Sequence, residues 1–387
     1  MKYIFIIMTV IMSVSINAKT SPIWGDLQKG VHAIGFKVIY ATDYSRGADK
    51  TYNDMGDRIK VDAFSLVQIN LWYPAKKSRK DRMKVLDYIY KANQVKSSKD
   101  LSNQEKKDIE EKVFAWNKSF TNEVEKQAIF STRTQAQFYA KAKKGSFPII
   151  TYLAGTSDGN YVIAEYLASH GFIVISVPSS DSVGNLFSYS EGWAAQINDT
   201  QFALNHLHGK INADYENIGV VGASHGGIIA PFLQIQNPSI KGVISLDGME
   251  IWEMYKDTYK AFPYKNFKNS NVPYVVFQSK LPASLVDYGF YDHLKYADKT
   301  IIKGIDFSHA DYSALSIAMY DKIAPSFYKG EKELDNSIKL VGEYLLSFFK
   351  LHLSADINAQ TTLDSYENIN NVTIEKTAAL PVPVNKK

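Results

Sequence analysis

The pentapeptide Gly222-Ala223-Ser224-His225-Gly226 says most about the fold of this 387-residue chain. It matches the G-x-S-x-G pattern of a nucleophile elbow, in which a serine stands on a sharp turn between a strand and a helix. The apolar run 218–221 before it predicts a buried strand, and 227–233 after it predicts the start of an apolar helix. Because the flanking glycines let strand and helix approach closely, we expect Ser224 to present an exposed hydroxyl. An ordinary turn rich in glycine and serine is the alternative.

Apolar runs and helical patterns alternate on both sides of this motif. Apolar strands joined by helices are typical of a mostly parallel sheet covered on both faces, so the sequence predicts an α/β fold. Expected strands are 33–40, 65–73, 147–153, 172–177, 217–223, 242–246, 272–277 and 300–305, and expected helices are 161–169, 193–207 and 337–353.

Two regions differ from this alternation. Residues 76–145 predict a helical insertion, with a capping box at Ser102–Glu105 and a further helix at 135–144. The insertion fits a moving lid over the site and equally a fixed structural cover. Beyond about residue 354 the periodicity is lost, which predicts a loosely attached tail over 354–387.

The first 18 residues are typical of a secretory signal peptide. Lys2 precedes an apolar run, Tyr3 to Val14, that is too short for a comfortable membrane span, and small residues predict cleavage after Ala18. Residues 19–387 are then expected to form one secreted or periplasmic domain without stable membrane insertion. An uncleaved membrane anchor is the alternative.

The composition excludes several classes of site. With no cysteine, the chain has no disulfide, thiolate metal site or cysteine nucleophile. Its formal net charge of +4 is small, and positive and negative residues are interspersed along the chain. Nucleic acid is therefore not an expected partner. The acidic loop between the first two strands lacks the glycine and glutamate spacing of an EF-hand. No metal or other cofactor is predicted.

A serine nucleophile needs a base within hydrogen-bond reach and an acid that orients the base. In open α/β sheets these groups lie outside the carboxyl ends of strands, and in elbow proteins they come in the order serine, acid, histidine. His309 is the predicted base, because only a short loop separates it from the end of strand 300–305. His293 is the alternative, whereas His352 lies near the end of the last helix, away from that edge.

The predicted acid is Asp247, which stands directly after strand 242–246. The next strand ends in Gln278-Ser279-Lys280 and offers no carboxylate. Asp287 is the fallback. A turn formed by Asp247 with the glycine after it, without a chemical role, is the other explanation.

Acyl transfer also needs N–H donors for the developing oxyanion. The backbone N–H groups of His225 and of Thr156, in the turn after strand 147–153, are the predicted donors. The imidazole of His225 is expected to pack or to form a pocket wall. The candidate pocket aromatics, which fit core or surface positions equally well, are Trp252, Tyr255, Tyr259, Phe262, Tyr288, Phe290 and Tyr291.

These motifs resemble those of the α/β-hydrolase superfamily, closest to platelet-activating-factor acetylhydrolase and related dienelactone-hydrolase-like secreted esterases. The resemblance covers roughly residues 30–353, with the acid 23 residues past the serine, and is weakest at Ala154-Gly155-Thr156 and in the insertion. It rests on Gly35-Phe36, Asp43–Arg46, Leu71–Pro74, Leu167–Val174, Gly222–Gly227 and His309–Asp311.

The sequence therefore predicts a serine hydrolase that cleaves small carboxylic esters, short acyl chains favoured, through an acyl-enzyme. A serine peptidase of the prolyl-oligopeptidase type shares the motif order, although no propeller domain is evident. A non-catalytic binding protein on a hydrolase scaffold is the alternative from another class. Nothing in the sequence indicates an oligomeric state.

Overall fold

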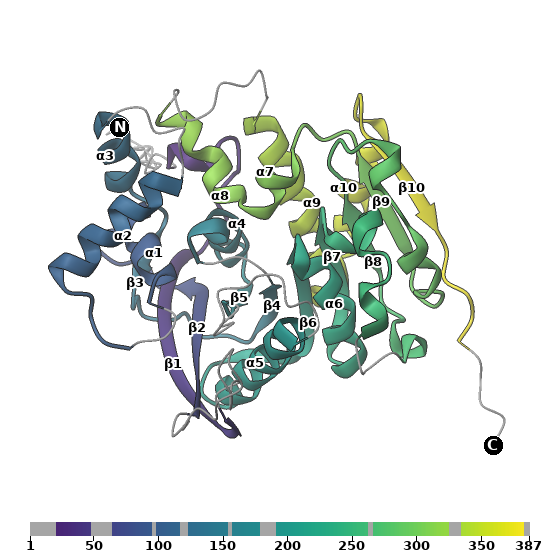
Figure 1. Cartoon of the computed structure of the whole chain (residues 1–387), viewed down its shortest axis with the longest axis horizontal. Helices are drawn as coiled ribbons and strands as arrows, with labels where there is room; N and C mark the ends of the chain where they lie inside the picture. Colours follow the sequence, from purple (N-terminus) through teal and green to yellow (C-terminus); the bar gives the residue numbers. More distant parts are fainter. Residues whose placement is uncertain are drawn as a thin grey trace, which may run out of the picture.

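The computed structural model describes residues 21–47, 64–94, 98–116, 123–153, 157–178, 191–261, 266–324 and 334–382. At the centre of this part of the chain is a ten-stranded sheet of order β10-β9-β8-β7-β6-β4-β5-β2-β1-β3 (Figure 1). The strands are β1 (Ala33–Gly47), β2 (Phe64–Ala75), β3 (Ala136–Phe138), β4 (Phe147–Leu153), β5 (Ile173–Ser176), β6 (Ala213–Ala223), β7 (Ile240–Leu246), β8 (Tyr274–Phe277), β9 (Lys299–Lys303) and β10 (Thr373–Thr377).

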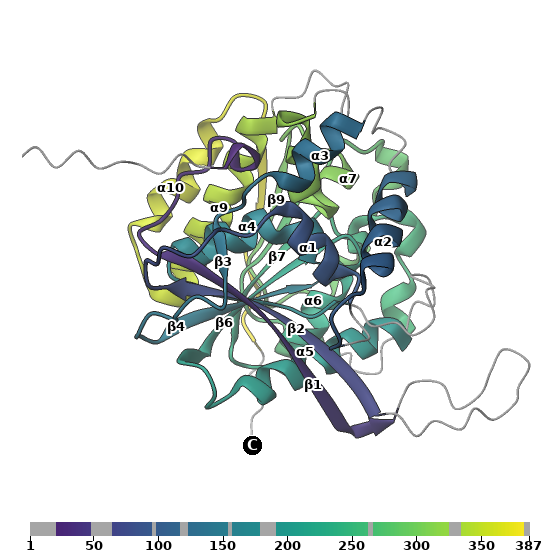
Figure 2. The same cartoon turned by 90° about the vertical axis from the view of Figure 1, so that its left-hand side faces the viewer.

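Strands β5, β4, β6, β7, β8 and β9 run parallel, and β2 and β10 flank them in antiparallel orientation. The β1–β2 ribbon continues past the helices, as Figure 2 shows. One face of the sheet is covered by α4 (Ser157–Ser169) and α9 (Leu334–Ser354), and the other by α5 (Glu191–Leu207) and α6 (His225–Gln236). The predicted α/β class, with a mostly parallel sheet between helical layers, is confirmed.

Two apolar cores form, one on each face of the sheet. In β6, Val221 packs in the core under α4 and α9, whereas its neighbour Val220 packs in the core under α5 and α6. The same alternation holds in β4 for Ile150 and Ile149. Because side chains alternate across a strand and both faces are buried, the sequences of these strands are continuous apolar runs.

Three helices lie within the expected insertion: α1 (Val85–Ala92), α2 (Asn103–Trp116) and α3 (Glu123–Ser131). The capping box is present, since Ser102 donates its backbone N–H to Glu105 Oε2 at 2.7 Å. The helix expected at 135–144 was wrong, because residues 136–138 form β3 and pair in parallel with β1. A local helical pattern cannot reveal pairing with so distant a strand.

Glu165, a fully buried residue of α4, ties the insertion to the body of the fold. Its carboxylate accepts hydrogen bonds from the Tyr88 hydroxyl at 2.8 Å and the Trp24 indole N–H at 3.2 Å. The backbone N–H groups of Gln135 and Ala136 donate to it at 2.9 and 3.1 Å. One carboxylate therefore joins α1, β3 and the amino-terminal segment to the helix that comes after the expected oxyanion turn.

The carboxyl-terminal segment is more ordered than its sequence predicts. Helix α10 (Ala359–Ser365) precedes β10, which pairs antiparallel with β9. The Tyr366 hydroxyl donates to Leu340 O of α9 at 2.6 Å. The expectation of a loosely attached tail was wrong for this stretch. An exposed edge strand carries little apolar periodicity, because its stability comes from backbone pairing.

Residues 1–20, with the expected signal peptide and the cleavage site after Ala18, lie outside the described residues. Among the residues that are described, no helix combines the length and apolar character needed to cross a bilayer. The secretory signal stays a prediction.

Replacing Glu165 by leucine should leave four buried donors without an acceptor. Because an unsatisfied buried polar group costs about 1–3 kcal/mol, we expect the free energy of unfolding to fall by at least about 3 kcal/mol. Urea denaturation monitored by circular dichroism measures the change. The matched control is Glu216→Leu at an exposed position, with an expected change within about 0.5 kcal/mol. Equal midpoints for both variants would show that other contacts hold the insertion.

Candidate active site

Ser224 stands on the turn between β6 and α6, with φ 54° and ψ −120°. This backbone conformation is strained for a residue with a side chain. A Cβ at Gly222 would lie 2.2 Å from Gly226 O, and a Cβ at Gly227 would lie 2.2 Å from Glu250 Oε2. Glycine is therefore required before the turn at position 222, as the sequence pattern predicts, and also at position 227, which lies outside that pattern.

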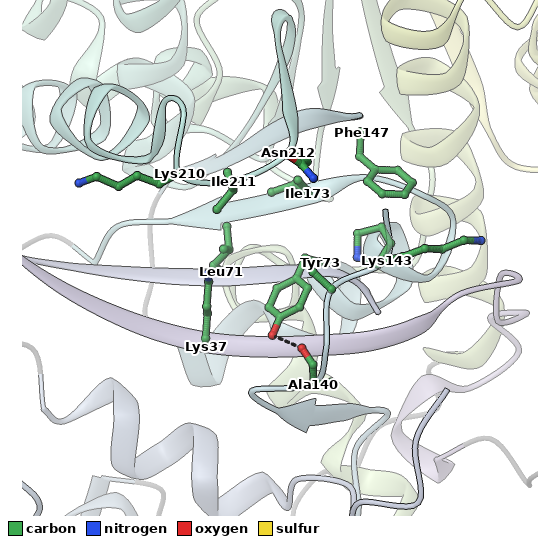
Figure 3. A pocket seen from close by; sticks show the side chains of 12 residues that line it. Lys37, Leu71, Tyr73, Ala140, Lys143, Phe147, Ile173, Lys210, Ile211 and Asn212 are labelled. Atoms are coloured by element: carbon green, nitrogen blue, oxygen red, sulfur yellow. Dashed lines mark hydrogen bonds between the residues drawn. The ribbon is translucent and has the colours of Figure 1, made fainter. Parts of the chain in front are cut away.

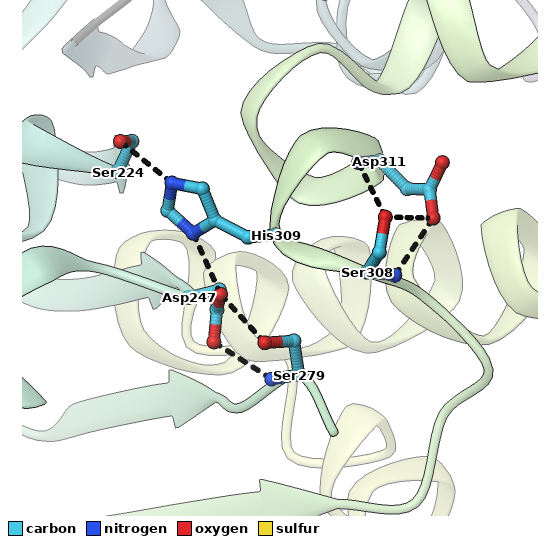
Figure 4. A network of polar contacts seen from close by, with 6 residues as sticks. All are labelled: Ser224, Asp247, Ser279, Ser308, His309 and Asp311. Atoms are coloured by element: carbon cyan, nitrogen blue, oxygen red, sulfur yellow. Dashed lines mark hydrogen bonds and ion pairs between the residues drawn. The ribbon is translucent and has the colours of Figure 1, made fainter. Parts of the chain in front are cut away.

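The structure brings Ser224, His309 and Asp247 into one hydrogen-bonded line (Figure 4). Ser224 Oγ lies 3.0 Å from His309 Nε2, and His309 Nδ1 lies 2.7 Å from Asp247 Oδ2. Both ring nitrogens are thus engaged, one by the hydroxyl and one by the carboxylate. This is the relation of nucleophile, base and orienting acid that acyl transfer requires.

His309 begins the short helix α7 (His309–Ser313), which is succeeded by α8 (Leu315–Ala318). Ser308 caps α7: its backbone N–H donates to Asp311 Oδ2 at 2.7 Å, and its Oγ donates to the same atom at 2.6 Å (Figure 4). This local box fixes the backbone that carries the imidazole. The side chain of His309 is 28% exposed, so solvent and substrate can reach it.

Asp247 is fully buried directly after β7, and its own φ of 45° is also positive. Besides His309, its carboxylate accepts the backbone N–H of Ser279 at 2.7 Å and the Ser279 hydroxyl at 2.8 Å. Three donors therefore stabilise a buried anion. Sequence reasoning missed Ser279, because a serine after a strand looks like any turn residue. Its position after β8, beside β7, is the signal that could have found it.

The alternative side chains have other partners. His293 Nε2 lies 2.6 Å from the Tyr259 hydroxyl, and its ring stacks on Phe267. Asp287 accepts a hydrogen bond from the backbone of Gly289 within a local turn. His352 packs against a phenylalanine of its own helix, where burial lowers its pKa. None of these contacts places these side chains at Ser224.

His225 is the first residue of α6, so its backbone N–H has no acceptor within the helix. Desolvation lowers the pKa of its imidazole to about 4, which leaves the ring neutral. The second expected donor, Thr156, lies outside the described residues, as does Phe262. Of the two expected donors, the structure therefore describes only the amide of His225.

Of the predicted pocket aromatics that are described, Trp252 contacts the site. Its ring meets the His309 ring edge-on, with centroids 4.7 Å apart. Tyr259 and Phe290 instead pack together in a separate aromatic cluster. The others are buried or half-buried in the core under α5 and α6: Tyr255, Tyr288 and Tyr291.

A second buried carboxyl, Glu250, lies beneath the elbow. Its Oε1 is 3.1 Å from the Tyr274 hydroxyl, which is also 3.2 Å from Gly227 O. Burial, with a smaller contribution from the charge of Asp247, raises the pKa of Glu250 to about 7. Its protonated form is therefore favoured in the folded state over a wider pH range than in the unfolded chain.

The contribution of Glu250 to the free energy of unfolding should fall as pH rises from about 4.5 towards 8. The folded state binds the Glu250 proton more tightly than the unfolded state, so its contribution is complete at low pH and is lost through a pKa of about 7. The expected loss is about 3 kcal/mol. The free energy of unfolding of the parent protein minus that of Glu250→Gln, measured by urea titrations at several pH values, should therefore fall over this range. A variant with the same pH slope as the parent protein would contradict the assignment.

No protein-family model matches the chain, and no curated protein is detectably similar to it in sequence. Among solved structures, the chain is similar to a ferulic acid esterase from Streptomyces cinnamoneus, with a TM-score of 0.57 and 17% identity. The match covers 88% of this chain and 96% of that one. At this identity the likeness carries the fold alone, and the chain has the α/β-hydrolase fold.

Proposed function

We propose that this protein is a serine hydrolase that cleaves carboxylic esters, with short acyl chains favoured, through an acyl-enzyme. The observation that carries the proposal is the line from Ser224 Oγ through His309 to Asp247, with contacts of 3.0 and 2.7 Å. The resemblance to acetylhydrolases and dienelactone-hydrolase-like esterases suggests the short acyl chains. The expected signal peptide supports action outside the cytoplasm.

In the proposed mechanism His309 Nε2 accepts the proton of Ser224 as Oγ attacks the ester carbonyl carbon. Asp247 keeps the remaining N–H of the ring on Nδ1 and stabilises the cation. The tetrahedral intermediate collapses, the C–O bond to the alcohol breaks, and His309 returns the proton to the leaving alkoxide. Water then attacks the acyl-enzyme with His309 again as base, which releases the acid and restores Ser224.

The oxyanion is assigned to backbone donors. The N–H of His225 points from the positive end of the 12-residue helix α6, where the helix dipole favours negative charge. The N–H of Thr156 is the proposed second donor. Preorganised donors of this kind stabilise the transition state without reorganisation during the reaction.

Apolar side chains suggest the character of the substrate. Trp252 forms one wall at His309, and a backbone bridge joins it to Val286. On the segments after the acid and after Ser279, Met254 is 71% exposed and Leu285 is 46% exposed. An ester with an apolar acyl or alcohol group fits these surroundings. The structural neighbour, a ferulic acid esterase, adds esters of aromatic acids as a second substrate class.

The first test is hydrolysis of nitrophenyl esters from acetate to octanoate. Ser224→Ala and His309→Ala should each lower kcat at least about 10³-fold while the fold is kept, and Asp247→Asn should cost somewhat less. The matched control is His293→Ala, which should keep the parental kcat because its ring bonds to Tyr259.

Loss of activity in His293→Ala with full activity in His309→Ala would overturn the assignment of the base. Failure of a fluorophosphonate to label Ser224 in the folded protein would favour the binding-protein alternative. Turnover of peptide anilides in place of esters would favour the peptidase.

Ser279→Ala should lower kcat by at least about tenfold, because it removes one hydrogen bond to the buried Asp247 carboxylate, worth about 1.5–3 kcal/mol, and keeps the backbone N–H donor. Steady-state kinetics on the best nitrophenyl ester measure the effect, and KM should stay constant because Ser279 supports the acid and not the substrate. A rise in KM at unchanged kcat would show that Ser279 binds substrate instead.

A further inference from the structure

A pocket of about 290 Å³ opens at the amino-terminal ends of β4 and β5 (Figure 3). Ser224 stands after the carboxyl end of β6, which runs parallel to β4, so the pocket lies at the opposite edge of the sheet. The described residues that line it are Lys37, Leu71, Tyr73, Pro74, Ala140, Ala142, Lys143, Phe147, Ile173, Lys210, Ile211 and Asn212. Its volume is at the small end of ligand pockets, which span about 300–1,000 Å³.

The apolar wall of the pocket is held in place before any ligand arrives. A Cβ at Gly35 would lie 2.4 Å from the Tyr73 ring, so the absence of a side chain there makes room for the ring. The Tyr73 hydroxyl donates to Ala140 O at 2.8 Å, the dashed line in Figure 3. Leu71 and Ile173 of the neighbouring strands add buried aliphatic surface. A rigid apolar wall favours a compact apolar group.

Lys37 supplies an uncompensated positive charge to this wall. It is half-buried in β1, opposite Leu71, and its ammonium lies 5.7 Å from the centre of the Tyr73 ring. Within the described part of the chain no carboxylate pairs with it. Desolvation accordingly lowers its pKa. A half-buried ammonium is only partly solvated and here lacks a counter-ion, so an anion at this position would be favourable.

Two more lysines line the pocket, and Figure 3 shows their side chains extending away from it. Lys143 Nζ lies 3.0 Å from His32 Nδ1, and Lys210 Nζ lies 3.1 Å from His206 Nε2. Burial, and to a smaller extent the neighbouring ammonium, lowers the pKa of both histidines. These partners are neutral bases, so they leave the lysine charges in place. None of the described residues lining the pocket is acidic.

We propose that this pocket binds a small carboxylate with an aromatic or aliphatic body. The body packs against Tyr73, Leu71 and Ile173, and the carboxylate pairs with the ammonium of Lys37. This inference does not depend on the role of Ser224. Should the protein hydrolyse esters, the released acids belong to the same chemical class.

Isothermal titration calorimetry with 3-phenylpropionate tests the proposal, and its uncharged amide, 3-phenylpropionamide, is the control ligand. We expect the acid to bind and the amide to bind at least about tenfold more weakly, because a charge-assisted contact is lost. Lys37→Met should raise the Kd for the acid by a similar factor. Ala142→Trp should block binding by filling the pocket from an exposed position.

Two matched variants separate this pocket from other sites. Lys268→Met removes one exposed lysine elsewhere and should leave the Kd unchanged. Trp252→Ala alters the wall at His309 and should also leave it unchanged. Loss of binding in Trp252→Ala but not in Lys37→Met would place the acid near Ser224 and overturn the proposal. Equal affinity of acid and amide, or no binding to the parent protein, would overturn it as well.

Discussion

The parallel register of β6, β7, β8 and β9 is the constraint on which the site depends. Each of these strands supplies one group from its carboxyl end or from the segment after it: Ser224, Asp247, Ser279 and His309 respectively. Backbone hydrogen bonds fix the register: Ser224 N to Leu246 O at 3.2 Å, Asp247 N to Phe277 O at 2.7 Å, and Gln278 N to Ile302 O at 2.8 Å. A shift of one residue in the pairing register of any of these strands would turn its side chains to the other face of the sheet. The hydrogen bonds that join Ser224, His309 and Asp247 would then be lost.

This constraint also explains how much of the site the sequence could reveal. Ser224 has a local signature, and Asp247 and His309 stand just past the ends of later strands, so the rule about strand ends was enough to find them. Ser279 also follows the end of a strand, but its role is to donate two hydrogen bonds to Asp247. These bonds depend on the pairing of β7 with β8. The residue type at position 279 does not by itself reveal these hydrogen bonds.

The errors at β3 and β10 have a common physical origin. Both strands lie at the edges of the sheet and pair on one side only; β3 is mostly buried but only three residues long, whereas β10 is mostly exposed. Edge strands have no need of a continuous apolar run, so the pattern that identified β4 to β9 is weak in them. Strand β10 forms because β9 offers unpaired backbone groups on its outer side, and this becomes apparent only in the folded sheet.

The two ends of the parallel strands carry side chains of opposite charge. At the carboxyl edge a buried carboxylate, Asp247, is satisfied by donors of the chain itself. At the amino edge Lys37 has no such partner among the described residues. The seven-residue strand β4 links the edges over on the order of 20 Å, from Phe147 in the pocket to the turn expected to hold Thr156. Because β4 is paired on both sides, it cannot shift alone without breaking two ladders. An acid bound at Lys37 should therefore stabilise the fold by mass action and leave the geometry at Ser224 unchanged.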